Sequence, residues 1–202
     1  MNKIVKNALI LTVITLVSGL LLGLVYEVTK NPIAASQEKA KQEAYKAVLK
    51  DAESFEEYAD FDEKEAAKVV ADISGCRVDE VAEAKDGSGE TIGYVVTTTS
   101  SEGYGGDIQI SVGITNDGVV QGIEILSISE TAGLGMKATE ADFRGQYVGK
   151  EVESFSVTKT GASADNEIDA LSGATITSNA VTGAVNTGLA YFNQVLGGSA
   201  NE

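Results

Sequence analysis

Residues 107–129 read DIQISVGITNDGVVQGIEILSIS, a stretch that predicts two antiparallel strands and the turn between them. The apolar residues of the first half alternate strictly with other residues, as they do in a strand that buries one face. Residues 116–118, Asn-Asp-Gly, have the composition of a hairpin turn. The apolar residues are Ile108, Ile110, Val112 and Ile114 before the turn and Val119, Ile123, Ile125 and Ile128 after it. This stretch therefore predicts an antiparallel sheet with one buried face.

The neighbouring sequence extends this pattern in both directions. Residues 78–85 and 91–99 have strand composition and flank Asp-Gly-Ser-Gly at residues 86–89, which predicts another hairpin. Downstream, we expect a short helix over residues 139–147 and a strand over residues 153–157. A long helix follows, and its apolar face is formed by Val181, Ala184, Val185, Gly188, Leu189, Phe192, Val195 and Leu196. The predicted fold class is α+β, an antiparallel sheet with packed helices.

The loop before this last helix, residues 172–178, reads Ser-Gly-Ala-Thr-Ile-Thr-Ser and offers four hydroxyls among small neighbours. A helix N-terminus carries unpaired N–H groups and a partial positive charge, so this loop is a candidate phosphate site. We expect Ser178 or Thr177 to be the N-cap. Thr175, Thr177 and Ser178 are equivalent candidates for a phosphate ester by this reasoning. The alternative is a simple capping loop, which needs only one hydroxyl.

Residues 8–25 form an uncharged apolar run near the N-terminus. As a helix, 18 residues extend about 27 Å, close to the thickness of a bilayer core. Lys3 and Lys6 precede the run and acidic sequence follows it, so the positive-inside rule places the N-terminus in the cytoplasm. We therefore expect a single-pass protein of the cell membrane whose main domain lies outside the cytoplasm. A cleaved signal peptide is the alternative, although the small residues at 34–36 lie far from the run.

A helical spacer is predicted between the anchor and the sheet. Asn31 and Pro32 fit the N-cap and first position of a helix that continues to about Ala52. Phe55, Tyr58 and Phe61 follow in an acidic stretch, and residues 63–73 form a second helical candidate. The expected organisation is an N-terminus and anchor over residues 1–30, a helical spacer over 31–77, and the main domain over 78–202.

The composition excludes several function classes. The 202 residues carry a formal charge of −15, and residues 31–202 contain 12 Lys and Arg against 29 Asp and Glu. This excess of negative charge disfavours binding to nucleic acid. It favours a domain that lies away from the membrane surface, or one that docks on a basic partner. The chain has no histidine and a single cysteine, Cys76, which we expect to be half-buried. Histidine-based nucleophile activation, histidine-ligated metals and internal disulfides are therefore excluded.

Residues 169–175, Asp-Ala-Leu-Ser-Gly-Ala-Thr, match the Asp-x-x-(Ser/Thr)-Gly-Ala-Thr signature of the bacterial FMN-binding domain family. The anchor and residues from about 78 to 196 resemble the G subunits of Rnf ion-translocating electron transport complexes. A more distant resemblance is to the C subunits of the sodium-pumping NADH:quinone reductases. The resemblance implies that a flavin transferase using FAD joins FMN, through its phosphate, to Thr175. It also implies a phosphate lined by Ser172, Gly173, Ala174 and Thr177, with Asp169 in the recognition motif.

Two further segments resemble elements of that family. Residues 129–135 read SETAGLG where the family often has HETPGLG, a loop along the flavin, so Ser129 replaces His and Ala132 replaces Pro. Residues 103–106, Gly-Tyr-Gly-Gly, resemble a glycine turn that leads into a strand. The alternatives are a glycine-rich connector and a tight turn with a packed tyrosine. The residues that the resemblance places near FMN are Glu130, Thr131, Gly133, Leu134 and Tyr104.

The resemblance implies an electron-carrying subunit with covalent FMN, in a membrane complex that couples electron transfer between ferredoxin and NAD to ion translocation. Its partners would be the other membrane and soluble subunits, and its chemistry would be that of the flavin alone. We expect no catalytic side chain and no metal site. Two alternatives stay open, a stand-alone membrane-anchored flavoprotein and a non-redox surface binding module. In the latter, residues 172–178 would only cap a helix.

Overall fold

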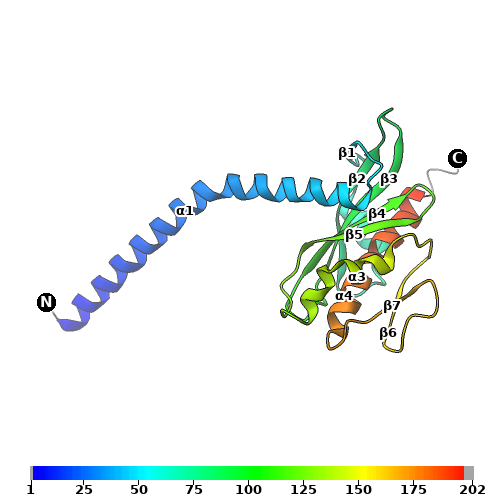
Figure 1. The fold of residues 1–202 in the computed structure, drawn as a ribbon. Coiled ribbons are helices and arrows are strands. Elements are labelled where there is room, and N and C mark those ends of the chain that lie inside the picture. Colours follow the sequence, from blue (N-terminus) through cyan, green and yellow to red (C-terminus); the bar gives the residue numbers. More distant parts are fainter. Residues whose placement is uncertain (1, 198–202) are drawn as a thin grey trace. The chain divides into compact units, whose positions relative to one another are not determined.

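The computed structural model describes residues 2–197. The chain divides into two compact units, and the boundary in the sequence lies between Lys41 and Gln42. The second unit contains a five-stranded antiparallel sheet of order β1-β2-β3-β4-β5 (Figure 1). Its strands are β1 (Ser54–Glu57), β2 (Cys76–Lys85), β3 (Thr91–Ser100), β4 (Ile108–Thr115) and β5 (Val120–Ser127). The predicted α+β class, an antiparallel sheet with packed helices, is confirmed.

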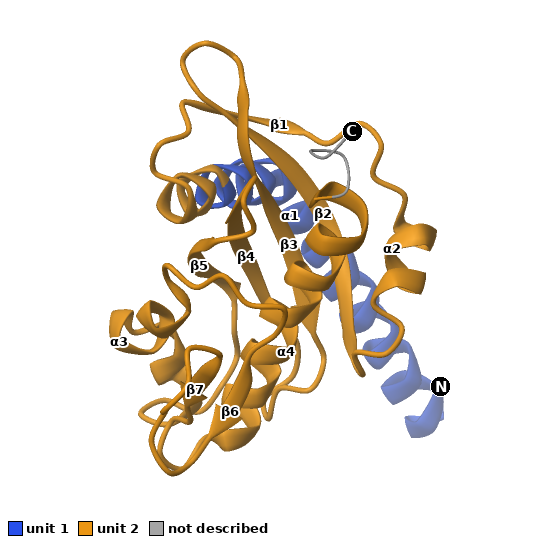
Figure 2. Ribbon diagram, turned by 90° about the vertical axis from the view of Figure 1, so that its right-hand side faces the viewer, with its two compact units in different colours: residues 1–41 blue, residues 42–202 orange. Residues whose placement is uncertain are grey.

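One face of the sheet packs against the helix α4 (Thr175–Tyr191), which crosses it (Figure 2). The alternation in β4 is confirmed, because Ile108, Ile110, Val112 and Ile114 are all fully buried. In β5 the buried residue at the start is Val120, whereas the sequence predicted Val119. A register shift where Gly113 and Ile114 pair with β5 accounts for the difference, since one extra residue reverses the facing of a strand.

The opposite face of the sheet is also covered, which corrects the prediction of one buried face. A second apolar cluster forms there around Tyr45, Val48 and Leu49, at the end of the helix α1 (Lys3–Val48) and just beyond it. Gly113 and Gly122 are paired across β4 and β5, and a Cβ on Gly113 would lie 2.6 Å from the Val48 carbonyl oxygen. Val48 therefore packs directly on a sheet surface that two glycines leave bare.

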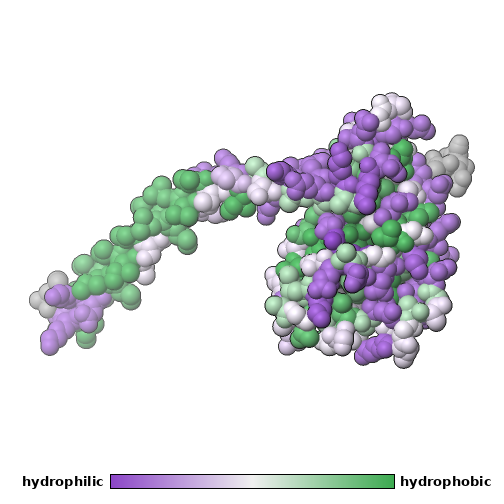
Figure 3. Space-filling model, in the orientation of Figure 1, coloured by the Kyte–Doolittle hydropathy of each residue, from purple (hydrophilic) through white to green (hydrophobic). Residues whose placement is uncertain are grey.

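The first unit consists of the α1 residues up to Lys41, and its apolar side chains are exposed. The helix is long and apolar enough to cross a membrane, and none of its most apolar 18-residue window is buried (Figure 3). The predicted helix start at Asn31 and Pro32 is wrong, because α1 runs through Pro32 without a break. A proline removes one helical hydrogen bond, and the stretch that follows it is rich in strong helix formers such as Ala34, Ala35 and Glu38.

Residues 42–77 belong to the second compact unit, together with the sheet. α1 ends at Val48 and not at Ala52, and the next element is the unpredicted strand β1, which pairs with β2. The second helical candidate forms as α2 (Glu63–Val69), ending four residues earlier than expected. The Asp62 side chain caps α2 by accepting hydrogen bonds from the amides of Lys64 and Glu65.

Between β5 and α4 the chain forms short elements that the sequence predicted only in part. The expected helix over 139–147 is divided into η1 (Gly135–Thr139), α3 (Ala141–Arg144) and η2 (Gly145–Tyr147). The strand expected at 153–157 begins later, as β6 (Ser156–Thr158), and pairs in parallel with the unpredicted β7 (Glu167–Asp169). The last helix ends in a π-helical turn, η3 (Phe192–Leu196), and its predicted apolar face packs on the sheet or against the core.

Candidate functional site

An open cavity of about 620 Å³ lies at the N-terminal end of α4. Three segments that are distant in sequence form its wall: the β3–β4 connection, the loop from β5 into η1, and the start of α4. The lining residues are Tyr104, Glu130, Thr131, Leu134, Gly135, Gly173, Ala174, Thr175, Ile176 and Thr177. The three motifs recognised separately in the sequence therefore meet at one site.

α4 begins at Thr175, so the predicted N-caps Ser178 and Thr177 lie inside its first turn. The capping residue is Ala174, and its side chain cannot accept a hydrogen bond. The first bond of the helix runs from the Ser178 amide to the Ala174 carbonyl oxygen, over 3.0 Å. Among the described residues, the amides of Thr175, Ile176 and Thr177 have no acceptor. Three unpaired donors at the positive end of a helix form an anion-binding wall.

The three hydroxyls that the sequence could not distinguish have different environments. The Ser178 hydroxyl is fully buried, accepts the Leu171 amide and donates to the Ala174 carbonyl oxygen. Both threonines line the cavity, but Thr177 is 1% exposed, whereas Thr175 is half-buried. Thr175 is therefore the most exposed residue of the three.

The cavity wall is held together by close approaches at glycines. The Gly105 amide donates to the Glu130 carboxylate over 3.1 Å, joining the β3–β4 connection to the loop after β5. Gly173 has φ +76°, a conformation that glycine adopts without strain, and a Cβ there would lie 3.2 Å from the Leu134 side chain. A Cβ on Gly135 would lie 2.5 Å from the Thr177 hydroxyl.

Three of the predicted site residues do not line the cavity. Asp169 ends β7, where its carboxylate accepts the Ala162 amide over 2.7 Å and its own amide donates to the Gln146 side chain. These two hydrogen bonds hold the end of β7, just before the loop over residues 172–178. Ser172 and Gly133 are exposed beside the cavity.

Two lining residues, Gly135 and Ile176, were missed. Gly135 ends the Gly-Leu-Gly pattern, and its contact with Thr177 depends on the packing of the folded chain. Ile176 is an apolar residue in a hydroxyl-rich loop, and its side chain is 53% exposed. With Tyr104 at 73% and Leu134 at 43%, it forms an exposed apolar rim around the cavity mouth. Such a rim beside an anion-binding wall suits a ligand with a phosphate and a flat apolar ring.

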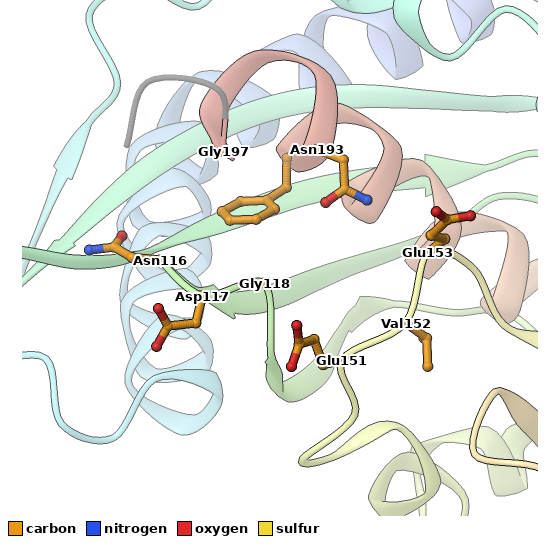
Figure 4. Close-up of a pocket in the computed structure, with 9 residues that line it drawn as sticks. Asn116, Asp117, Gly118, Glu151, Val152, Glu153, Asn193 and Gly197 are labelled. Atoms are coloured by element: carbon orange, nitrogen blue, oxygen red, sulfur yellow. The ribbon is translucent and has the colours of Figure 1, made fainter. Parts of the chain in front are cut away.

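A second cavity, of about 530 Å³, lies near the end of α4 (Figure 4). Its walls come from the β4–β5 turn, the segment before β6, and the η3 turn with Gly197. Asp117, Glu151 and Glu153 make it acidic, which disfavours a phosphate. Within residues 2–197, no group of three His, Cys, Asp or Glu side chains is placed to hold a metal ion.

Family models match two parts of the chain. The FMN-binding domain model matches residues 103–190, which include every residue that lines the first cavity, and the RnfG N-terminal region model matches residues 1–48, which contain α1.

Curated relatives match almost the whole chain. The G subunit of the Na(+)-translocating ferredoxin:NAD(+) oxidoreductase complex of Acetobacterium woodii is 35% identical, over 94% of this chain and 92% of its own. The G subunit of the proton-translocating ferredoxin:NAD(+) oxidoreductase complex of Clostridium ljungdahlii is 33% identical over 96% and 93%. The G subunit of the ion-translocating oxidoreductase complex of Methanosarcina acetivorans is 35% identical over 95% and 96%. Among solved structures, NqrC of Shewanella oneidensis matches with a TM-score of 0.60 at 20% identity, over 79% of this chain and 95% of its own, which shows the fold.

Proposed function

Because the chain belongs to the family of G subunits of ion-translocating oxidoreductase complexes, we propose that it is an electron-carrying subunit that holds FMN at the start of α4. The observation that carries the proposal is the cavity itself, where three unpaired amides, an accessible threonine hydroxyl and an apolar rim face one space. When bound, FMN supplies the transfer of one or two electrons. The chain supplies its position and its surroundings.

FMN is attached covalently to Thr175. In this reaction a P–O bond of the FAD pyrophosphate breaks, the Thr175 oxygen forms the new phosphoester, AMP leaves and the hydroxyl proton is released. The accessibility of Thr175, compared with the buried Thr177 and Ser178, supports this assignment. An FAD-dependent flavin transferase is the maturation partner.

The phosphate is held by the backbone and not by a cation. None of the ten residues that line the cavity is a lysine or arginine, and Lys137 is exposed outside it. The amides of Thr175, Ile176 and Thr177 donate to the remaining phosphate oxygens, and Gly173 and Ala174 leave room for the phosphate. Leu134, Ile176 and Tyr104, which line the cavity and are exposed, would contact the flavin ring.

α1 anchors the protein in the membrane with its N-terminus in the cytoplasm. Its length, its exposed apolar surface and the position of Lys3 and Lys6 support a single pass in this direction. The FMN domain then lies outside the cytoplasm, where an ester bond prevents loss of the cofactor by dilution. Gly19 and Gly23 leave open space around the helix and allow close packing of a membrane partner.

The partners are the other membrane and soluble subunits of the complex, which couples electron transfer between ferredoxin and NAD to ion translocation. The relatives match over more than 90% of both chains and are named as subunits, which favours a complex over a stand-alone flavoprotein. One of them is named for Na⁺ and another for protons at similar identity, so the similarity does not favour either ion.

The test compares ferredoxin-dependent NAD reduction in membranes whose native chain is replaced by the wild type, by Thr175→Ser or by Thr175→Ala. We expect Thr175→Ser, which keeps a hydroxyl, to retain activity, and Thr175→Ala to abolish it with the complex still assembled. Full activity of Thr175→Ala would contradict the proposal. Blots for the partner subunits verify assembly in each strain.

A further inference from the structure

The β3–β4 connection, residues 103–106, is fastened to the rest of the site through Glu130. The Gly105 amide donates to Glu130 Oε1 over 3.1 Å, and a Cβ on Gly103 would lie 3.0 Å from the same oxygen. The backbone of Gly105 also lies close to that of Ser129, since a Cβ on Gly105 would lie 2.1 Å from the Ser129 carbonyl oxygen. Because Gly103 and Gly105 have no side chains, the Glu130 carboxylate fits against the backbone of this connection.

The same carboxylate also lies against Gly135, which begins η1 and packs on the first turn of α4. A Cβ on Gly135 would lie 2.7 Å from Glu130 Oε2 and 2.5 Å from the Thr177 hydroxyl. The half-buried Glu130 side chain therefore lies between the β3–β4 connection and the residues packed on the first turn of α4. One side chain relates the three walls of the cavity to one another.

Tyr104, beside Gly105, is the residue whose position depends on this arrangement. Its side chain is 73% exposed and lines the cavity, and within the described residues its ring packs against no other aromatic ring. Burial therefore contributes little to the position of the ring, and the hydrogen bond of the neighbouring amide contributes more.

Electrostatics argues that Glu130 does not bind the phosphate. It is the one carboxylate among the ten lining residues, and a negative charge repels a phosphate group. Its hydrogen bond with the Gly105 amide indicates that it holds the cavity wall instead.

We propose that Glu130 is a positioning residue whose carboxylate, by accepting the Gly105 amide, holds Tyr104 at the cavity wall, where the tyrosine would shield bound FMN from water. This inference rests on the proposed function for its ligand and goes beyond it in assigning the residue that holds the wall. The Gln side chain keeps an amide-accepting oxygen, so Glu130→Gln retains the hydrogen bond, whereas Glu130→Ala removes it.

The first experiment measures collisional quenching of flavin fluorescence by iodide on the full-length chain in detergent, made with its flavin transferase. We expect the quenching constant to rise in Glu130→Ala and Tyr104→Leu and to stay at the wild-type level in Glu130→Gln. The double variant should match Tyr104→Leu alone, because Glu130 acts through Tyr104. Glu151→Ala, which removes an exposed acid at the second cavity, is the matched control and should have no effect.

A second experiment does not require the flavin and so separates the inference from the proposed function. Hydrogen–deuterium exchange of the full-length chain made without transferase follows the peptide that contains residues 103–106. We expect faster exchange in Glu130→Ala than in the wild type and in Glu130→Gln. Equal exchange in all three chains overturns the inference, as does an unchanged quenching constant in Glu130→Ala or an additive effect in the double variant. The proposed function alone is overturned if the wild-type chain carries no flavin after production with the transferase, while the exchange of residues 103–106 still responds to Glu130→Ala as expected.

Discussion

Gly135 lies so close to Thr177 that a Cβ at residue 135 would come within 2.5 Å of the Thr177 hydroxyl oxygen. The loop after β5 thereby packs directly on the first turn of α4, next to the accessible hydroxyl of Thr175. This contact aligns the apolar part of the cavity with its anion-binding part. The flavin site therefore depends on a glycine that does not itself need to touch the cofactor.

We expect Gly135→Ala to reduce the fraction of chains that carry FMN. The added methyl group displaces Glu130 or Thr177, at a cost of about 1–3 kcal/mol for overpacking. The ratio of flavin absorbance to protein, after production with the transferase, measures the effect. Gly145→Ala is the control, because a Cβ there meets nothing within 4 Å and its φ of −62° suits alanine. Equal loading of both variants would contradict the assignment.

Asn186 fastens the segment before β6 to α4. Its side chain accepts the Phe155 amide over 2.7 Å and donates to the Phe155 carbonyl oxygen over 2.9 Å. Asn186→Ala leaves both backbone groups without their partner, so we expect a loss of about 1–3 kcal/mol in the free energy of unfolding. Urea denaturation measures it. Asn179→Ala, at an exposed position of the same helix, should change the stability far less.

Tyr147 makes the stability of the second unit sensitive to alkaline pH. Its ring is fully buried, which raises the pKa of the phenol above the ordinary value of 10, and the hydrogen bond of 2.8 Å with Thr182 opposes this only in part. Above pH 10 the unfolded chain loses this proton and the folded chain keeps it. The free energy of unfolding therefore falls as the pH rises, by up to about 1.4 kcal/mol per pH unit for this group.

Urea denaturation at several pH values between 8 and 11.5 tests this behaviour. We expect Tyr147→Phe to have a shallower decline above pH 10 than the wild type, although it loses one buried hydrogen bond. Tyr104→Phe is the matched control, because it removes one phenol from an exposed position. Identical slopes in all three chains would show that Tyr147 does not contribute.

The direction of the anchor can be tested by labelling. In a Cys76→Ala background, Lys159→Cys places a thiol on an exposed loop of the second unit, and Asn2→Cys places one before the anchor. We expect a membrane-impermeant maleimide to label the first in intact spheroplasts and the second only after lysis. The opposite pattern would place the FMN domain in the cytoplasm.

The sequence predicted the elements whose pattern is local. Strict alternation identified β4, and the turn composition at residues 86–89 and 116–118 identified the hairpins, because both signals lie within a few residues of the strands they join. The strand β1 and the coverage of the second sheet face were missed. Both depend on contacts with residues far along the chain, such as Val48 against Gly113.

The same distinction applies to the site. The signature at residues 169–175 is recognisable without a structure, and the resemblance that it carries implies Thr175 as the attachment residue. The predicted start of α4 was three or four residues too late because hydroxyls suggested a side-chain cap, whereas Ala174 precedes the helix and leaves the amides unpaired. Gly135 and the hydrogen bond between Glu130 and Gly105 were visible only in the folded chain.

Peptide mass spectrometry tests the central claim most directly. The full-length chain and its Thr175→Ala variant are produced with an active flavin transferase, and the peptide that contains residue 175 is analysed. The account predicts an added mass of FMN minus one water on Thr175 of the wild type, and none on the variant. An unmodified Thr175 beside a transferase that modifies another substrate, or FMN on a different residue, would contradict it.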